Sequence, residues 1–421
     1  MTQLALRSVA LGVLLTACSG DPVATVSMAA GAGGAGTFAG SGAIAAGTPS
    51  SGGGGASAAG AGPLPTAASG SGGVGNNSAA SGSGGSERSV AGGSGGAASP
   101  DTSSFGPAGS PVALHGQLKA QGNQVVDASG NPTQLKGMSL YWSDVSEGAR
   151  YFDPATVKWL VDDWHVGVIR ATIGVRESQG DYLSDPEGQL ELLDKVVAGA
   201  LETGIYVLVD WHDHFARQHT EQAKSFFGKV AEKYGSKPNV MYEIWNEPRG
   251  TGAGAATWDG DIEPYAQAIS TTLRQRGAHG LMIVGTPFWD QRPDEALTNR
   301  VQDENVAYTL HFYAGYAPHF FDNVGGGEVG KHAQAALDGG LPLFVTEFGT
   351  TAPDNTSFNE AETRKWIEFL DQKKISYCNW SITAVQEGSA AIHPSANPQG
   401  NWSDGDLSQS GKLVRSLIRG N

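Results

Sequence analysis

Eight short apolar runs, separated by longer segments, most restrict how this chain can fold. The runs predict strands at 135–138, 168–170, 205–210, 240–245, 281–285, 306–311, 343–347 and 377–380. The 3.6-residue apolar period of amphipathic helices recurs between them, at 189–202, 221–234, 262–276 and 360–373. Eight strand–helix units in about 290 residues give one unit per ~36 residues, which predicts an α/β fold with a closed (β/α)8 TIM barrel.

Composition divides the chain into three regions. Residues 19–110 hold 27 of the 61 glycines but only two of the 35 aromatic residues, so they cannot bury a core. We expect a disordered Gly/Ala/Ser-rich linker there, either a spacer that holds the rest away from a cell envelope or low-complexity sequence without function. Residues 111–421 are expected to form one domain. A short N-terminal β-hairpin is predicted before the barrel, with strands at 116–120 and 124–127 turned by the Ala-Ser-Gly-Asn-Pro segment at 128–132.

Residues 1–18 have the pattern of an export signal. One positive charge precedes an apolar run that is too short to span a bilayer, and the run ends in Leu15-Thr16-Ala17-Cys18. This ending resembles the bacterial lipobox, in which the cysteine is acylated after cleavage. We therefore expect a lipoprotein signal peptide, lipidation at Cys18 and a location on the cell envelope facing outward. The alternative is an ordinary secretory signal with a chance cysteine, and hence a secreted protein.

The charge balance limits the class of partner. The formal net charge is −15, almost all of it in residues 111–421. Such a surface disfavours nucleic acid and anionic membranes, so we expect membrane contact only through the lipid anchor. A neutral substrate and a monomeric protein are expected.

Polar side chains cluster where the predicted strands end. They are Arg170, Asp210, His212, Asn246, Glu247, His311, Tyr313 and Glu347. In a barrel of parallel strands these ends meet in one bowl, where active sites lie. The sequence therefore predicts an active site built from several strands.

Two glutamates in this set indicate a reaction. Glu247 and Glu347 follow apolar strand residues on the fourth and seventh predicted strands, where an ionised carboxylate needs partners or a raised pKa. A pair of facing carboxyl groups is what glycoside hydrolysis uses. The alternative is that each glutamate caps a helix or pairs with an arginine.

Aromatic residues beside the strand ends favour a sugar substrate, because pyranose faces pack on flat rings. They are Tyr141, Trp142, Trp211, Trp245, Tyr313, Phe348 and Trp380. Side chains of neighbouring strand residues point to opposite sides, so we expect Trp245 and Phe348 in the core and Trp380 on the ligand. His212 and His214 form a His-x-His pair that can bind zinc, but no third ligand is evident, so no metal and no cofactor are expected. His212 is expected to hydrogen-bond substrate or a glutamate.

These features together resemble glycoside hydrolase family 5, the retaining cellulases, and most closely its bacterial endoglucanases. The resemblance covers 115–419. It rests on His115-Gly116-Gln117-Leu118, Leu135-Lys136-Gly137-Met138-Ser139, Ile169-Arg170-Ala171, Val209-Asp210-Trp211-His212, Tyr242-Glu243-Ile244-Trp245-Asn246-Glu247-Pro248, Leu310-His311-Phe312-Tyr313-Ala314, Thr346-Glu347-Phe348-Gly349-Thr350 and Asn379-Trp380-Ser381.

The resemblance implies a role for each site residue. Glu247 is implied as the general acid/base and Glu347 as the nucleophile. The implied substrate-binding residues are Arg170, His212, Asn246, His311, Tyr313, Trp380, Tyr141, Trp142 and Glu387. Three positions depart from the family pattern. Tyr141 stands about where many family members have a histidine, Phe348 replaces the usual tryptophan, and Val385, two residues before Glu387, replaces a lysine.

The implied function is an endo-β-1,4-glucanase that cleaves internal bonds of cellulose by a retaining double displacement. One alternative keeps this mechanism and changes the polymer to mannan, xyloglucan or mixed-linkage glucan. Another is a surface lipoprotein that binds carbohydrate without turnover.

Overall fold

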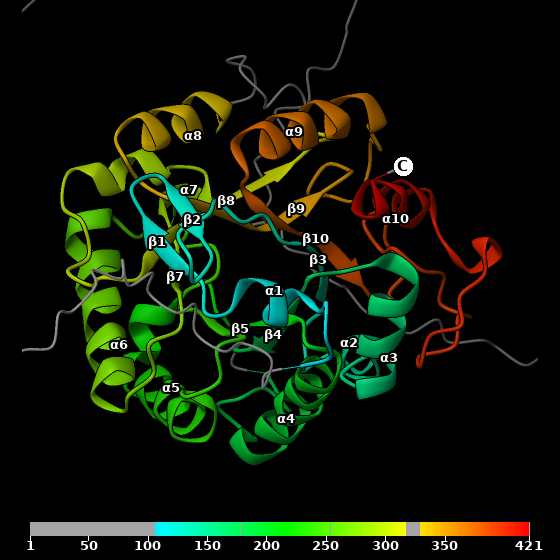
Figure 1. The fold of residues 1–421 in the computed structure, drawn as a ribbon, viewed down its shortest axis with the longest axis horizontal. Coiled ribbons are helices and arrows are strands. Elements are labelled where there is room, and N and C mark those ends of the chain that lie inside the picture. Colours follow the sequence, from blue (N-terminus) through cyan, green and yellow to red (C-terminus); the bar gives the residue numbers. More distant parts are fainter. Residues whose placement is uncertain (1–105, 177, 253, 317–328, 421) are drawn as a thin grey trace, which may run out of the picture. The chain divides into compact units, whose positions relative to one another are not determined.

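The computed structural model describes residues 106–176, 178–252, 254–316 and 329–420, so the predicted signal, Cys18 and almost all of the predicted linker lie outside the described residues. Eight parallel strands close into a barrel in the order β10-β3-β4-β5-β6-β7-β8-β9, surrounded by helices (Figure 1). The strands are β3 (Lys136–Leu140), β4 (Val168–Gly174), β5 (Tyr206–His212), β6 (Val240–Glu243), β7 (Met282–Val284), β8 (Val306–Tyr313), β9 (Leu343–Gly349) and β10 (Ser376–Ile382). The predicted barrel and its eight strands are confirmed.

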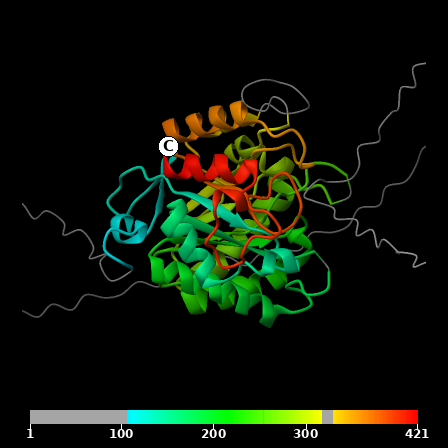
Figure 2. The same ribbon diagram turned by 90° about the vertical axis from the view of Figure 1, so that its right-hand side faces the viewer.

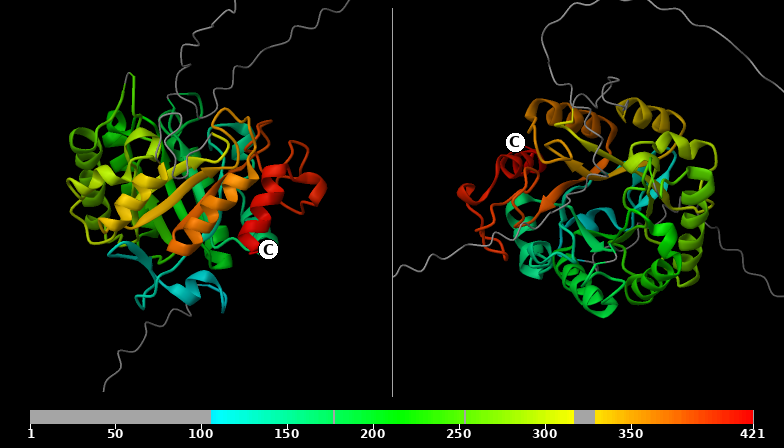
Figure 3. Two further views of the ribbon diagram at one scale, coloured as in Figure 1. Left: turned by 90° about the horizontal axis from the view of Figure 1, so that it is seen from above. Right: turned by 180° about the vertical axis from the view of Figure 1, so that it is seen from behind.

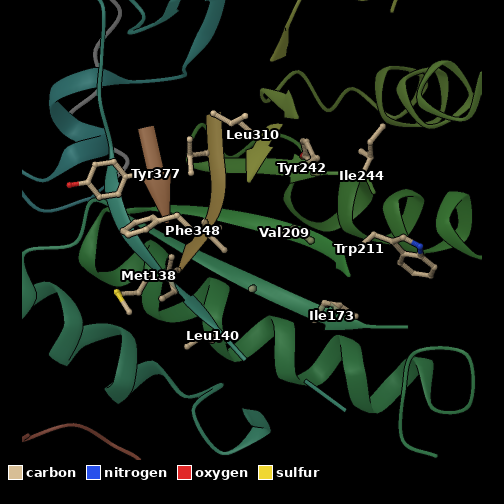
Figure 4. Packing of buried hydrophobic residues seen from close by; sticks show 14 of the residues in the cluster. Met138, Leu140, Ile173, Val209, Trp211, Tyr242, Ile244, Leu310, Phe348 and Tyr377 are labelled. Carbon is tan, nitrogen blue, oxygen red and sulfur yellow. The ribbon is translucent and has the colours of Figure 1, made fainter. Parts of the chain in front are cut away.

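Alternation along each strand separates two apolar layers. On β5, Val207, Val209 and Trp211 belong to the large cluster between barrel and helices, part of which is drawn in Figure 4. Tyr206 and Leu208 point inward and join a second cluster inside the barrel. The next inward residues are Asp210 and His212, so the barrel interior changes from apolar to polar toward the carboxyl ends of the strands.

Figures 2 and 3 show, in cyan, a small cap at one end of the barrel. It consists of α1 (Pro111–His115) and the antiparallel pair β1 (Lys119–Gln121) and β2 (Gln124–Val126). Val112, Leu118 and Val125 from this cap complete the inner apolar cluster. The cap therefore closes the end of the barrel where the strands begin.

Two details of the cap differ from the sequence analysis. The hairpin turns at Gly122 and Asn123, with Gly122 at φ 58°, and the Ala-Ser-Gly-Asn-Pro segment follows the second strand instead. A two-residue turn needs positive φ, which glycine supplies, and this signal was overlooked. In addition, Ser110 is buried and its side chain accepts the N–H of Ala113, so the last residues of the predicted linker contact the folded domain.

The helices around the barrel are α2 (Ser146–Ala149), α3 (Pro154–Trp159), α4 (Pro186–Thr203), α5 (Thr220–Tyr234), α6 (Glu263–Gln275), α7 (Pro287–Asp290), α8 (Val329–Asp338), α9 (Glu360–Lys373) and α10 (Gln409–Arg419). The four helices predicted from periodicity are α4, α5, α6 and α9, each within three residues of its predicted bounds. Among the described residues, no helix combines the length and apolar character needed to cross a membrane.

Candidate active site

Arg170 on β4 occupies the centre of the polar end of the barrel. Its side chain is fully buried, and it donates from Nε and Nη2 to the two carboxylate oxygens of Glu243 (2.7 and 2.9 Å) and from Nη1 to Oε2 of Glu347 (2.8 Å). Oδ2 of Asp210 lies 3.0 Å from Nη2. Burial alone would lower the pKa of Arg170, but the charges of Asp210, Glu243 and Glu347 hold it well above its usual value. The guanidinium is therefore a permanent cation among three carboxylates.

Glu347, at the carboxyl end of β9, is bound by two donors. Arg170 binds Oε2, and the hydroxyl of Tyr313 donates to Oε1 at 2.6 Å. Burial raises the pKa of Glu347, while the charge of Arg170 and the bond from Tyr313 oppose that shift. Both oxygens are held in place, and both donors favour the ionised carboxylate.

Glu247 follows β6 in a left-handed conformation, with φ 51°. Its Oε1 lies 3.1 Å from Nδ1 of His311, and its Oε2 lies 3.8 Å from Nδ1 of His214. Its backbone N–H donates to Oδ2 of Asp290 at 2.8 Å. Burial, and then the charges of Glu347 and Asp290, raise the pKa of Glu247 well above its usual range.

A chain of hydrogen bonds places a proton on Glu247. The hydroxyl of Thr346 donates to Oε1 of Glu243, which also accepts from Arg170, so Thr346 accepts from Nε2 of His311 at 2.8 Å. Burial and then the charge of Arg170 hold the pKa of His311 well below 6.5, so its other nitrogen, Nδ1, carries only a lone pair. The 3.1 Å contact between Nδ1 and Glu247 is then a hydrogen bond only when Glu247 is the donor.

The two glutamates face each other across the site. One oxygen of each lies within 4.8 Å of the other and of a His311 nitrogen. Retaining glycosidases hold their carboxyl groups about 5–5.5 Å apart, whereas inverting enzymes leave roughly 6.5–9.5 Å for a water. The closest oxygens of Glu247 and Glu347, at most 4.8 Å apart, favour the short carboxyl spacing of retaining enzymes.

The same geometry raises the question of a metal. Within the described residues, two sets of three side chains bring their ligand atoms within 4.8 Å: Glu243, Asp290 and His311, and Glu247, His311 and Glu347. His212 and His214 belong to neither set. Each set contains a carboxylate that already accepts from Arg170, so a guanidinium supplies the positive charge here.

An aromatic wall lines one side of the site. Trp380 stacks on His212, with ring centroids 5.3 Å apart and planes 4° apart, and contacts Tyr141 at 5.2 Å. Trp142 meets His212 edge-on at 4.0 Å, and its own ring is covered by the Arg176 guanidinium at 4.7 Å. Trp142 is therefore packed between protein groups and orients His212, while Trp380 and Tyr141 form the wall itself.

Two buried donors or acceptors remain for a ligand. Asn246 accepts from Arg170 through Oδ1 (2.7 Å), and its Nδ2 has no hydrogen-bond partner among the described residues. His212 faces Asp210 through Nδ1 at 2.6 Å, so of its two expected partners, substrate or a glutamate, substrate is the one that stays a prediction. Within the same described region, Nε2 of His212 also lacks a partner. Both groups fit the recognition of sugar hydroxyls.

Glu387 lies in the loop after β10, in the lining of a cavity of about 590 Å³ that Val385, Asn355 and Lys412 also line. Ser389 donates to Oε1 of Glu387 at 2.9 Å. Burial, and then the charge of Glu347, raise the pKa of Glu387 to about 7. Val385 packs against the wall with Tyr141 and Trp380, which connects this loop to the site.

Trp245 and Phe348, which were expected in the core, are both buried. Trp245 packs edge-on against Tyr265 at 5.1 Å, and Phe348 stacks on Phe312 at 5.3 Å. Both belong to the cluster between barrel and helices.

Four residues of the site received no role from the sequence: Glu243, Asp210, His214 and Asp290. Asp210 was placed at a strand end but without a role, and Glu243 was missed. Both could have been paired with Arg170, because a carboxylate at an inward position of an apolar strand needs a cation, and Arg170 stands one strand from Asp210 and two from Glu243. His214 lies in the loop after β5, and Asp290 ends the short segment α7 after β7, where strand periodicity carries no signal.

Comparison with known proteins adds a family assignment. The sequence model of cellulase (glycosyl hydrolase family 5) matches residues 126–386. An endoglucanase from Clostridium saccharobutylicum is 38% identical over 327 residues, which are 76% of this chain and 68% of that protein. Endoglucanase Z of Dickeya dadantii is 38% identical over 72% of this chain and 66% of its own length. The chain thus spans about two thirds of the length of these relatives.

Solved structures agree with this likeness. A structure from Cytophaga hutchinsonii is 43% identical, with a TM-score of 0.69 over 74% of this chain and 96% of that one. The catalytic domain of an endoglucanase from Thermobifida fusca, a variant in complex with cellotetraose, is 30% identical, with a TM-score of 0.65 over 74% of this chain and 100% of that one.

Proposed function

The chain belongs to glycoside hydrolase family 5, a family of retaining enzymes, and we propose that it is an endo-β-1,4-glucanase that hydrolyses internal bonds of cellulose-type glucans. The observation that carries the proposal is the facing pair of glutamates: Glu347 is bound by Arg170 and Tyr313, and Glu247 lies against His311 with a pKa that burial raises. We also propose that the protein is a monomer.

In the first half-reaction Glu347 is the nucleophile. Its carboxylate attacks the anomeric carbon, and the bond to the departing sugar oxygen breaks as that oxygen takes the proton of Glu247. Arg170 and Tyr313 hold the attacking carboxylate. The free amide N–H of Asn246 is assigned to the 2-hydroxyl of the sugar, and Trp380 to its face.

In the second half-reaction Glu247 acts as a base. It takes a proton from water, the water oxygen attacks the anomeric carbon, and the bond to Glu347 breaks. The product keeps the β-configuration because the carbon has been inverted twice. Glu247 is protonated again and Glu347 ionised, so the site returns to its starting state.

Two substitutions test the two roles. Glu347→Ala should abolish turnover of carboxymethylcellulose. With a substrate that carries an activated leaving group, added azide should restore release of that group, and the sugar should be recovered as an α-glycosyl azide. Glu247→Ala should keep the first step for substrates with a good leaving group, which need little protonation. A β-glycosyl azide from the Glu347 variant would mean that the two roles are exchanged, and an α-anomer as the first wild-type product would exclude retention.

We further propose that the enzyme is a lipoprotein anchored through Cys18 on the outer side of the cell envelope. The support is the sequence Leu15-Thr16-Ala17-Cys18 after a short apolar run. One acyl chain holds a protein only marginally, whereas two or more anchor it stably. Cys18→Ser should release activity into the medium or leave the signal uncleaved. Wild-type activity found entirely in the medium, without labelled fatty acid on the protein, would mean ordinary secretion.

A further inference from the structure

Asp290, the last residue of α7, contacts Glu247, which lies in the segment after β6. The Asp290 side chain is fully buried. Its Oδ2 accepts the backbone N–H of Glu247 at 2.8 Å, and its Oδ1 accepts the backbone N–H of Thr286 at 2.5 Å. One carboxylate therefore joins the segment after β6 to the segment after β7.

The backbone on both sides of this link is in an unfavourable conformation. Phe288, Trp289 and Asp290 have φ values of 59°, 55° and 61°, and Glu247 has φ 51°. L-residues rarely adopt this left-handed region, and they persist there only where surrounding contacts hold them. The N–H of Trp289 also donates to the carbonyl of Pro248 at 2.9 Å. The two segments are thus tied together by one bond in each direction.

The Asp290 carboxyl also lies near the side-chain contact that Glu247 makes with His311. Oδ2 of Asp290 lies 3.6 Å from Nδ1 of His311, the same nitrogen that faces Glu247. The other charged or titratable groups near Asp290 and Glu247 are Glu243 on β6, Arg170 on β4, Glu347 on β9 and His214 after β5. Asp290 accepts the backbone N–H of Glu247, and His214 also has a hydrogen bond to the Glu247 backbone.

We propose that Asp290 is a positioning residue for the acid/base step: it fixes the left-handed backbone of Glu247 and thereby keeps the Glu247 carboxyl against His311. The proposal rests on the role of Glu247 proposed above. A carboxylate is needed because two N–H groups meet two separate acceptor oxygens. Asparagine offers one acceptor and turns an NH₂ group toward the other N–H, so it would release one side of the link.

The test compares leaving groups in Asp290→Asn, with Asp290→Ala as a second variant. The probes are phenyl β-cellobioside, whose leaving group needs a proton, and 2,4-dinitrophenyl β-cellobioside, whose leaving group does not. We expect kcat/KM for the phenyl substrate to fall on the order of 10- to 100-fold, within the range of acid/base assistance, and that for the dinitrophenyl substrate to change by less than about 3-fold. Azide should raise dinitrophenyl turnover, because azide attacks the glycosyl-enzyme without a base.

Asp127→Asn is the matched control. Asp127 is also buried and accepts two backbone N–H groups, from Ser129 and Asn131, but it lies beside the hairpin at the other end of the barrel. Its substitution should change both substrates by the same small factor and leave the azide response at the wild-type level.

Two other results for the Asp290→Asn variant would contradict the proposal. Equal losses on both substrates in Asp290→Asn, or no loss on either, overturn the positioning role. Glu247→Ala is measured alongside as the reference. If Glu247→Ala fails to spare the dinitrophenyl substrate, the assignment of Glu247 fails, whereas a selective Glu247 variant with a non-selective Asp290 variant rejects only the inference about Asp290.

Discussion

Arg170 is the residue on which most of the site depends. It is fully buried and touches Asp210, Glu243, Glu347 and the oxygen of Asn246. Replacing one partner of a buried ionic network costs more than the network itself contributes, because the remaining charges stay buried and unpaired.

We expect Arg170→Met to lower the free energy of unfolding by about 3–5 kcal/mol and to abolish most activity. Without the cation, the folded-state pKa values of the remaining carboxylates lie above their unfolded values. The loss should therefore be smallest at acidic pH and grow as the pH rises toward 8. Denaturant unfolding of both proteins at several pH values measures this. Arg364→Met, at an exposed ion pair with Glu360, should cost less than ~1 kcal/mol, and a pH-independent deficit in the Arg170 variant would contradict the argument.

At this scale the sequence predicts residues on strands better than residues in loops. Arg170, Glu247, His311 and Glu347 were identified because strand ends converge in a barrel whatever the loops do. Which nitrogen faces which carboxylate was not predictable. The pairing of His212 with Asp210, and the approach of Asp290 to Glu247, depend on side-chain rotamers and on a left-handed turn that local sequence does not encode.

At the scale of elements, period and spacing were sufficient for the barrel but not for every helix. β3 to β10 were recognisable because an apolar run bounded by polar residues recurs eight times. The short α10 was not predicted. Its apolar stripe is short, with Leu413, Val414, Leu417 and Ile418, and its first turn contains Ser410 and Gly411, which are poor helix formers.

The pairing of β3 with β4 leads to a prediction about Gly137. A Cβ there would lie 2.0 Å from the carbonyl oxygen of Val168, the residue it pairs with. We expect Gly137→Ala to lower the free energy of unfolding by at least about 1–3 kcal/mol, since a rigid barrel wall cannot make room without moving backbone. Gly167→Ala, whose nearest atoms would be 3.6 Å away, is the control and should be tolerated. Equal unfolding midpoints for the two variants would show that the barrel yields at this contact.

At the scale of the molecule, the start of the folded domain can be located by truncation. The buried Ser110 caps α1, and the N–H of Val112 donates to the carbonyl of Gly204 at 2.9 Å. Removing 19–105 should leave the melting temperature within about 1 °C, because that stretch has too few apolar residues to add to a core. Removing 106–110 as well should lower it by roughly 1–2 °C, the effect of losing about 1 kcal/mol of capping in a domain of this size. A calorimetric scan of the two shortened proteins decides this, and a drop on the first truncation would refute it.

The position of that first contact also shows at which end the chain enters the barrel. Gly204 immediately precedes the start of β5, so the chain enters the barrel at the end closed by the cap, opposite the bowl that holds Glu247 and Glu347. For a protein anchored at Cys18, the linker would join the barrel at the end opposite the active site. A glucan that enters the bowl would therefore approach Glu247 and Glu347 from the end of the barrel opposite this attachment point.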